Sequence, residues 1–131
     1  MGRKALAILV ISGFVAVGGP ASAHHSIAGY EQKPSTIQGV VTAVRWTNPH
    51  MAIELAVPTG DGKTETWFIE GGYVSAQINA GLTRLILKPG VTVKVFGRRH
   101  RDPSMRMAVL NGIEVNGKYY QRGGGDIKDT P

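Results

Sequence analysis

Hydrophobic and polar residues alternate along most of the chain after residue 35, which is the pattern of strands that bury one face. The clearest run is 51–57, where Met51, Ile53, Leu55 and Val57 alternate with smaller or charged residues. Residues 73–80 instead have the composition of a short helix, which Gly81 would end. Together with the turn residues between the runs, the pattern predicts strands over residues 37–46, 51–57, 64–70, 91–96, 105–115 and 118–121.

Two of these strands contain residues that disturb a regular ladder. Gly39 lies inside the first strand and predicts a bulge or a bend. Asn111-Gly112 lies inside the fifth strand and predicts a second bend.

Three strands, a short helix and two further strands follow the order of an OB-type barrel. We therefore expect an all-β, OB-like five-stranded barrel with one short helix between strands 3 and 4. An open β-sandwich is the alternative, because periodicity alone does not determine strand order. The barrel domain is expected over residues 36–122, after an N-terminal arm at 24–35 and before a Gly-rich, polar tail at 123–131 that we expect to be disordered.

Residues 1–23 have the pattern of a secretory signal peptide. Arg3 and Lys4 precede an apolar run over 5–17, and small residues stand at Ala21 and Ala23. The apolar run is shorter than the roughly 20 residues that a membrane span needs. We therefore expect cleavage between Ala23 and His24, and a periplasmic or secreted chain whose mature form has no transmembrane segment.

The composition narrows the chemistry that the chain can perform. The sequence contains no cysteine, so disulfides and thiolate ligands are excluded. Its 15 basic residues exceed its 9 acidic ones, and the excess is concentrated in a basic loop at Arg98, Arg99, His100 and Arg101. Such a loop is usually a solvated surface, but it also suits an anionic ligand or partner protein. Nucleic acid is not expected as a partner, because an exported protein rarely meets it.

Histidine carries the most distinctive chemistry. If His24 becomes the first residue, its α-amino nitrogen and ring Nδ1 can chelate one metal ion, an arrangement that suits copper. His50 follows Asn48-Pro49, and the proline restricts the backbone so that the ring leaves the barrel rim in a defined direction. Folding of the arm over that rim would give a three-nitrogen histidine-brace site for Cu(II) from His24 and His50. His25 can replace His50 as the third ligand, and His50 can instead bond a backbone carbonyl.

Other polar and sulfur-containing residues have less specific readings. Glu70 can accept a ring N–H from a metal-binding histidine, or pair with Arg45. His100 is expected at the surface among arginines. We assign the methionines to core packing rather than to copper: Met51, Met105 and Met107. No Ser-His-Asp spacing, paired-carboxylate element or phosphate loop stands out, so an enzyme is not favoured.

Several segments together resemble a family of small exported bacterial proteins of unknown function: His24-His25-Ser26, Trp46-Thr47-Asn48-Pro49-His50, Trp67-Phe68-Ile69-Glu70 and Leu87-Lys88-Pro89-Gly90 with Val91-Thr92-Val93. The resemblance implies periplasmic location and a single barrel-like domain. It brings no established activity. This chain departs from the family pattern at Ile27, at Tyr30-Glu31 and at Asp102-Pro103-Ser104.

Two functions remain open from the sequence. The first is a periplasmic metal-binding protein, with copper as the expected cofactor and His24, His50 and His25 as its ligands. The alternative is an OB-like interaction module, in which the basic loop binds an anionic ligand, a lipid headgroup or a periplasmic partner protein. A free N-terminal His24 is required by the first function and is irrelevant to the second.

Overall fold

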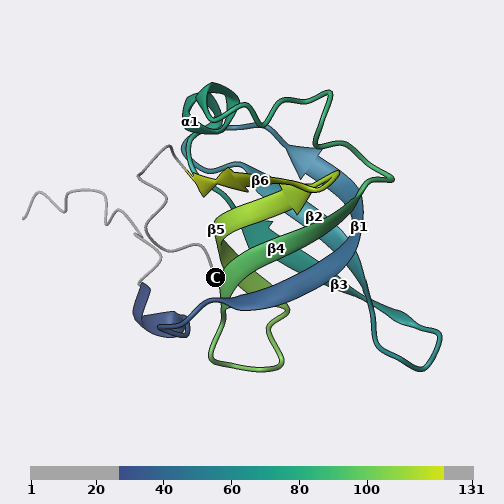
Figure 1. Cartoon of the computed structure of the whole chain (residues 1–131). Helices are drawn as coiled ribbons and strands as arrows, with labels where there is room; N and C mark the ends of the chain where they lie inside the picture. The colour runs from purple at the N-terminus through teal and green to yellow at the C-terminus, as the bar shows by residue number, and fades with distance from the viewer. Residues whose placement is uncertain (1–26, 123–131) are drawn as a thin grey trace, which may run out of the picture.

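The computed structural model describes residues 27–122. Figure 1 shows how the elements of this part are arranged. In chain order they are η1 (Ile27–Gly29), β1 (Ser35–Arg45), β2 (Ala52–Pro58), β3 (Thr64–Glu70), α1 (Val74–Asn79), β4 (Thr92–Arg99), β5 (Met107–Val115) and β6 (Lys118–Gln121). Each expected strand and the expected helix is present. The largest difference between a predicted and an observed bound is at the end of β4, which lies at Arg99 rather than at residue 96.

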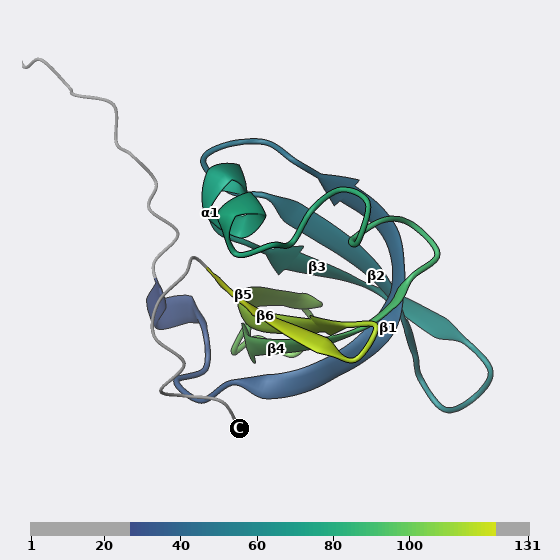
Figure 2. The same cartoon turned by 45° about the horizontal axis from the view of Figure 1, so that its top comes forward.

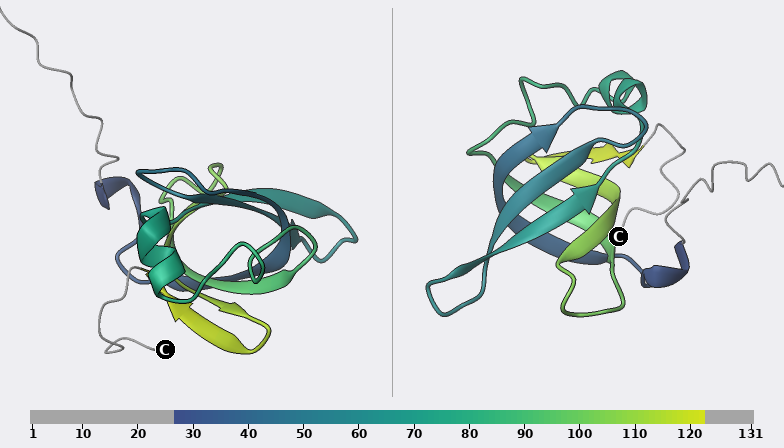
Figure 3. Two further views of the ribbon diagram at one scale, coloured as in Figure 1. Left: turned by 90° about the horizontal axis from the view of Figure 1, so that it is seen from above. Right: turned by 180° about the vertical axis from the view of Figure 1, so that it is seen from behind.

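The strands close into a barrel. β1, β2 and β3 pair in antiparallel order, β1 also pairs with β4, and β4 pairs with β5. A parallel pairing of β3 with β5, from Phe68 opposite Met107 to Glu70 opposite Val109, completes the ring. Figure 3 shows this ring from above. The domain is therefore a closed five-stranded mixed barrel of OB-like type with α1 between β3 and β4, and the open sandwich is excluded.

β1 is shared between two neighbours, and it bends where the partner changes. Its first half pairs with β4 and its second half with β2, and Val40 pairs with both. The adjacent Gly39 lies so close to β2 that a Cβ there would stand 2.6 Å from the Ala56 carbonyl oxygen. The bulge itself lies later, because the register passes from Val41–Leu55 to Ala43–Glu54 and leaves Thr42 outside the ladder. The bulge in β1 thus lies three residues after Gly39, the position at which the sequence predicted a bulge or a bend.

A second irregularity lies in β5. The register between β4 and β5 passes from Phe96 opposite Gly112 to Gly97 opposite Leu110. Asn111 is therefore the extra residue of a bulge, as the sequence predicted for this pair. Beyond the bulge, β6 pairs with the second half of β5, on the edge that β3 occupies along the first half.

The core fills the barrel interior with the inward-facing residues of the alternating runs. β4 shows the pattern clearly: Val93 and Val95 are buried, while Thr92 is exposed. Leu82 and Leu87, in the segment after α1, are also buried in this cluster. Other fully buried members are Ile37, Val41, Met51, Ile53, Leu55, Ile69, Leu110 and Ile113.

The three methionines do not share one environment. Met51 is fully buried, which confirms its assignment to the core. Met107 is half-buried at the start of β5. Met105 was wrongly assigned to the core: it is 41% exposed, because β5 begins two residues later and leaves Met105 in the preceding loop.

The expected signal peptide, the candidate ligands His24 and His25, and the expected disordered tail at 123–131 lie outside the described residues. Within residues 27–122, α1 is far too short to cross a bilayer and no other helix is long and apolar enough to do so.

Candidate functional site

The Trp46–His50 element forms the loop between β1 and β2, and Asn48 ties this loop to the helix. The Asn48 Oδ1 atom accepts the backbone N–H of Val74, the first residue of α1, at 3.1 Å. Tyr73, at the N-cap position itself, makes no side-chain cap. Asn48 therefore supplies from a distant segment the acceptor that a helix N-terminus needs. Figure 2 shows the loop and α1 at the same end of the barrel.

The backbone beside His50 is fixed in the same way. Met51 donates its N–H to the Gly72 carbonyl at 3.0 Å, and Gly71 donates to the Met51 carbonyl at 2.8 Å. The Met51 side chain is fully buried and packs directly against Gly71. These contacts extend the β2–β3 pairing by one step, and they hold His50 against the junction between β3 and α1.

The His50 ring is oriented by two acceptors on one nitrogen. Its Nδ1 atom lies 3.2 Å from the Gly71 carbonyl oxygen and 3.2 Å from Glu70 Oε1. Two acceptors require that Nδ1 carries the hydrogen, so in the neutral ring Nε2 keeps its lone pair. The ring also stacks on Tyr73, with centroids 6.3 Å apart. Within residues 27–122, Nε2 has no hydrogen-bond partner, and the side chain is 44% exposed.

These contacts identify the partner of Glu70 and one of the expected contacts of His50. Glu70 contacts the histidine, and among the described ion pairs it has none with Arg45. The expectation that His50 bonds a backbone carbonyl is confirmed, and the same nitrogen also faces the carboxylate. Neither role uses Nε2, so neither competes with a metal ion for that atom.

Residues 27–122 do not form a metal site by themselves. No group of three or more histidine, aspartate or glutamate side chains in this range is arranged to hold a metal ion. His50 is the one predicted ligand that the structure describes. A site of the predicted kind would need the amine and the ring of His24 to supply the other nitrogens.

Glu70 also acts on Tyr30, the residue that follows η1 in the N-terminal arm. Tyr30, which follows η1, is buried, and burial together with the negative charge of Glu70 raises the pKa of its phenol. Glu70 thus contacts His50 and also acts electrostatically on Tyr30. Figure 1 shows α1 at the upper left of the barrel and η1 at its lower left.

The basic cluster at 98–101 differs from the expected solvated loop. Arg98 and Arg99 belong to β4 and are half-buried. Arg99 Nη2 donates to the Thr36 carbonyl at 3.0 Å, and Arg101 Nε donates to the Tyr30 carbonyl at 2.9 Å. His100, expected at the surface, is half-buried, and its Nδ1 accepts the N–H of Asp102 at 3.1 Å.

Sequence reasoning missed a second group of polar contacts, around Trp67. The guanidinium carbons of Arg99 and Arg106 lie 5.0 Å and 5.9 Å from the Trp67 ring centroid. Arg106 also makes two hydrogen bonds to the Glu65 carboxylate, at 2.7 Å and 2.8 Å. This contact lowers the pKa of Glu65 and raises that of Arg106. The sequence does contain one signal for these contacts. Glu65 and Trp67 are two residues apart in a predicted strand, so their side chains lie on the same face.

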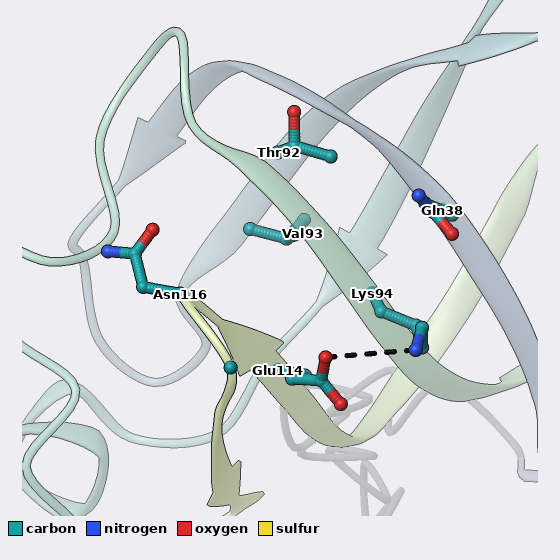
Figure 4. A pocket seen from close by; sticks show the side chains of 7 residues that line it. Gln38, Thr92, Val93, Lys94, Glu114 and Asn116 are labelled. Carbon is teal, nitrogen blue, oxygen red and sulfur yellow. Dashed lines mark ion pairs between the residues drawn. The ribbon is translucent and has the colours of Figure 1, made fainter.

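A shallow cleft of about 280 Å³ lies on the outer wall of the barrel and contains no residue of the predicted metal site. Figure 4 shows its lining side chains and the ion pair between Lys94 and Glu114, whose charged atoms are 3.7 Å apart. The cleft is open to solvent and its lining is mostly polar. The lining residues are Gln38, Thr92, Val93, Lys94, Glu114, Asn116 and Gly117.

Comparisons with known proteins identify two solved structures of similar fold and one matching family model. One, from the S. pombe Stn1–Ten1 complex, is 15% identical with a TM-score of 0.47, over 66% of this chain and 60% of that one. The other, the S. cerevisiae mitochondrial single-stranded DNA binding protein Rim1, is 19% identical with a TM-score of 0.48, over 70% of this chain and 97% of that one. No curated protein matches the sequence. The family model of DUF6152, a family of unknown function, matches residues 12–108, and the chain therefore belongs to that family.

Proposed function

We propose that this chain is an exported copper-binding protein whose site joins His50 to the histidines at the start of the mature chain. The supporting observation is the orientation of the His50 ring. Its Nδ1 atom faces Glu70 and the Gly71 carbonyl, both at 3.2 Å, which leaves the Nε2 lone pair available. Carboxylate or carbonyl partners on the second ring nitrogen are typical of histidines that bind metals, because they fix the tautomer and orient the ring.

The remaining ligands come from the sequence. Cleavage after Ala23 would give His24 a free α-amino group beside its imidazole, and these two nitrogens plus His50 Nε2 make three. Cu(II) prefers such tetragonal nitrogen ligation. His25 offers another imidazole at the neighbouring position and is the alternative third ligand. Export is part of the proposal, because the free amine depends on removal of the signal peptide.

The exposure of the His50 ring favours a role in copper binding and exchange over a buried structural metal. The ring is 44% exposed and lies on a loop that is held by the Met51 backbone on one side and by the Asn48 side chain on the other. A ligand that is pre-oriented and open to solvent can receive or release an ion without unfolding of the domain. We therefore favour copper buffering or delivery.

The test is a copper titration of the processed protein, after N-terminal sequencing has located the start of the mature chain. Four variants are compared with the wild type: a form with one extra N-terminal Gly, His50→Ala, Glu70→Gln, and Glu114→Gln as a control with the same charge change. We expect one Cu(II) per wild-type chain. Glu70→Gln should weaken binding by about 10- to 100-fold, the usual effect of removing such a partner. Glu114→Gln should leave it unchanged, since Glu114 lies in the cleft on the outer wall.

Two results would identify a different site. Equal affinity in the Gly-extended form would show that the free amine is not a ligand, because the extension converts the His24 nitrogen into an amide. Unchanged binding in His50→Ala would show that His24 and His25 hold copper without the barrel. Absence of copper binding, with retention on anionic vesicles that falls as salt rises, would favour the interaction module instead.

A further inference from the structure

A buried glutamine lies in the short helix at one end of the barrel. Of the polar and charged residues in 27–122, Gln77 alone is buried, and it is 0% exposed. Its backbone is fully bonded: its N–H donates to the Tyr73 carbonyl at 3.2 Å, and its carbonyl accepts the N–H of Leu82 at 3.0 Å. Its side chain is not, because neither Nε2 nor Oε1 has a hydrogen-bond partner within the same residues. A buried amide without partners is costly, so it points to a bound polar group.

The space beside Gly72 shows what this amide faces. A Cβ at Gly72 would stand 3.3 Å from Gln77 Nε2 and 3.4 Å from Arg122 Nε. Side chains from α1 and from the residue just after β6 therefore meet where Gly72 has no side chain. In the left view of Figure 3 the arrowhead of β6 lies beside α1. Both nitrogens are donors only, so the group between them has to be an acceptor.

Arg122 adds a positive charge that no described residue balances. It is half-buried, and the ion pairs of residues 27–122 do not include it. A guanidinium offers a planar fork of N–H groups that matches the oxygens of carboxylates and phosphates. Because the side chain is open to solvent on one side, an anion can reach it without unfolding of the domain. The acceptor is therefore expected to carry a negative charge.

The remaining atom of the amide narrows the class of anion. Gln77 Oε1 is an acceptor and needs a donor, whereas Nε2 and Arg122 need acceptors. Nε2 and Oε1 are bonded to the same carbon, so one small ion can contact both. Hydrogen phosphate carries charged oxygens and a hydroxyl in one ion. Sulfate has a similar shape and charge but offers acceptors alone, so it would leave Oε1 without a partner.

We propose that Gln77, Arg122 and Gly72 form a binding site for inorganic hydrogen phosphate between α1 and the end of β6. Arg122 supplies the charge, Gln77 selects an ion that carries a hydroxyl, and Gly72 keeps the space open. None of the three is a proposed copper ligand, and the site lies outside the basic loop at 98–101. Arg99 and Arg101 of that loop bond the protein's own carbonyls, which reduces what they offer to an anion.

The first test measures anion binding to the processed protein by calorimetry at constant ionic strength and neutral pH. Inorganic phosphate should bind with one ion per chain, and sulfate should bind about tenfold more weakly or worse, because Oε1 would stay unpaired. Phosphate should also shift the NMR signals of the Gln77 side-chain amide. Equal affinity for the two anions would overturn the selection of a hydroxyl, and an unshifted Gln77 amide would overturn the site.

Variants of Arg122 test the charge. Arg122→Gln should weaken phosphate binding about tenfold or more, the usual effect of losing a charged hydrogen bond. Arg122→Lys keeps the charge without the planar fork, so its affinity should lie between the two. Arg45→Gln is the matched control, because it removes the same charge from an exposed side chain with no hydrogen bond described for its guanidinium. Equal weakening in Arg45→Gln and Arg122→Gln would show an adventitious ion only, attracted by net charge.

Two further variants test the buried side of the site. Gly72→Ala would put a methyl group against both nitrogens, so phosphate binding should fall while stability changes little. Gln77→Met keeps the length of the side chain without its polar atoms. It should remove the preference for phosphate over sulfate, and it should not lower Tm in phosphate-free buffer, because the amide it removes is unpaired there. A clear loss of Tm in that buffer would show that the amide is bonded inside the protein, and would overturn the site.

Discussion

Replacing Gly39 by alanine tests the geometry that lets β1 serve two neighbours. The new Cβ would stand 2.6 Å from the Ala56 carbonyl oxygen and 3.0 Å from Val57 Cγ2. The carbonyl belongs to the β1–β2 ladder, so it cannot move without breaking pairing. Overpacking of this kind typically costs about 1–3 kcal/mol. Loss of glycine flexibility in the unfolded chain offsets about 0.4–1 kcal/mol. The expected net loss is therefore about 1–2 kcal/mol, or roughly 5–15 °C in Tm.

Urea unfolding of the wild type and Gly39→Ala measures this loss directly. Gly72→Ala is a control, because the nearest atoms to its Cβ are side-chain atoms at 3.3 Å or more, and its cost should be smaller. A second comparison uses Val57→Ala, which removes the side-chain contact and leaves the carbonyl. The Gly39→Ala loss should persist in that background. Stability of Gly39→Ala within about 0.5 kcal/mol of wild type would refute the close approach, since surface changes commonly fall in that range.

Two further predictions concern individual contacts. The pKa of Glu65 is lowered by Arg106 from its ordinary value of 4.5, so this pair stabilises the fold above that value and the contribution disappears as the pH falls through the lowered one. Glu65→Gln should therefore reduce stability near neutral pH, and unfolding by urea at about pH 3 should show a smaller difference; an equal difference at both would contradict the assignment. Asn48→Ala should lose about 1 kcal/mol through the missing helix cap, with faster hydrogen exchange at Val74, whereas Asn48→Asp, which keeps an acceptor oxygen, should retain protection.

Periodicity in the sequence was sufficient to locate the strands, because side chains on a strand alternate between core and solvent whatever its partners are. The bounds of β3 and β6 match the predicted ranges, and the bulge at Asn111 lies where Asn111-Gly112 predicted a bend. The end of β4 was not predicted, because Arg98 and Arg99 look like loop residues in isolation. They continue the strand because β5 and the arm pair with them.

Residue type and local spacing also identified part of the candidate site. His50 after Asn48-Pro49, and Glu70 beside a glycine pair, were recognisable as a possible ligand and its partner from chemistry alone. The distance of 3.2 Å between them, and the pairing of Glu70 with His50 rather than with Arg45, depend on the Met51–Gly71 backbone pairing that joins two distant segments. The cap that Asn48 gives to α1 has the same origin.

The sequence by itself thus determined the strand pattern, the short helix and the types of side chain available for metal binding. Closure of the barrel by β3 and β5, and the use of Arg99 and Arg101 to hold the arm, were decided by the tertiary structure. The physical reason is that alternation and composition are local properties of the chain. Which carbonyl a guanidinium reaches, or which strand completes a ring, depends on segments far apart in sequence that meet only when the chain folds.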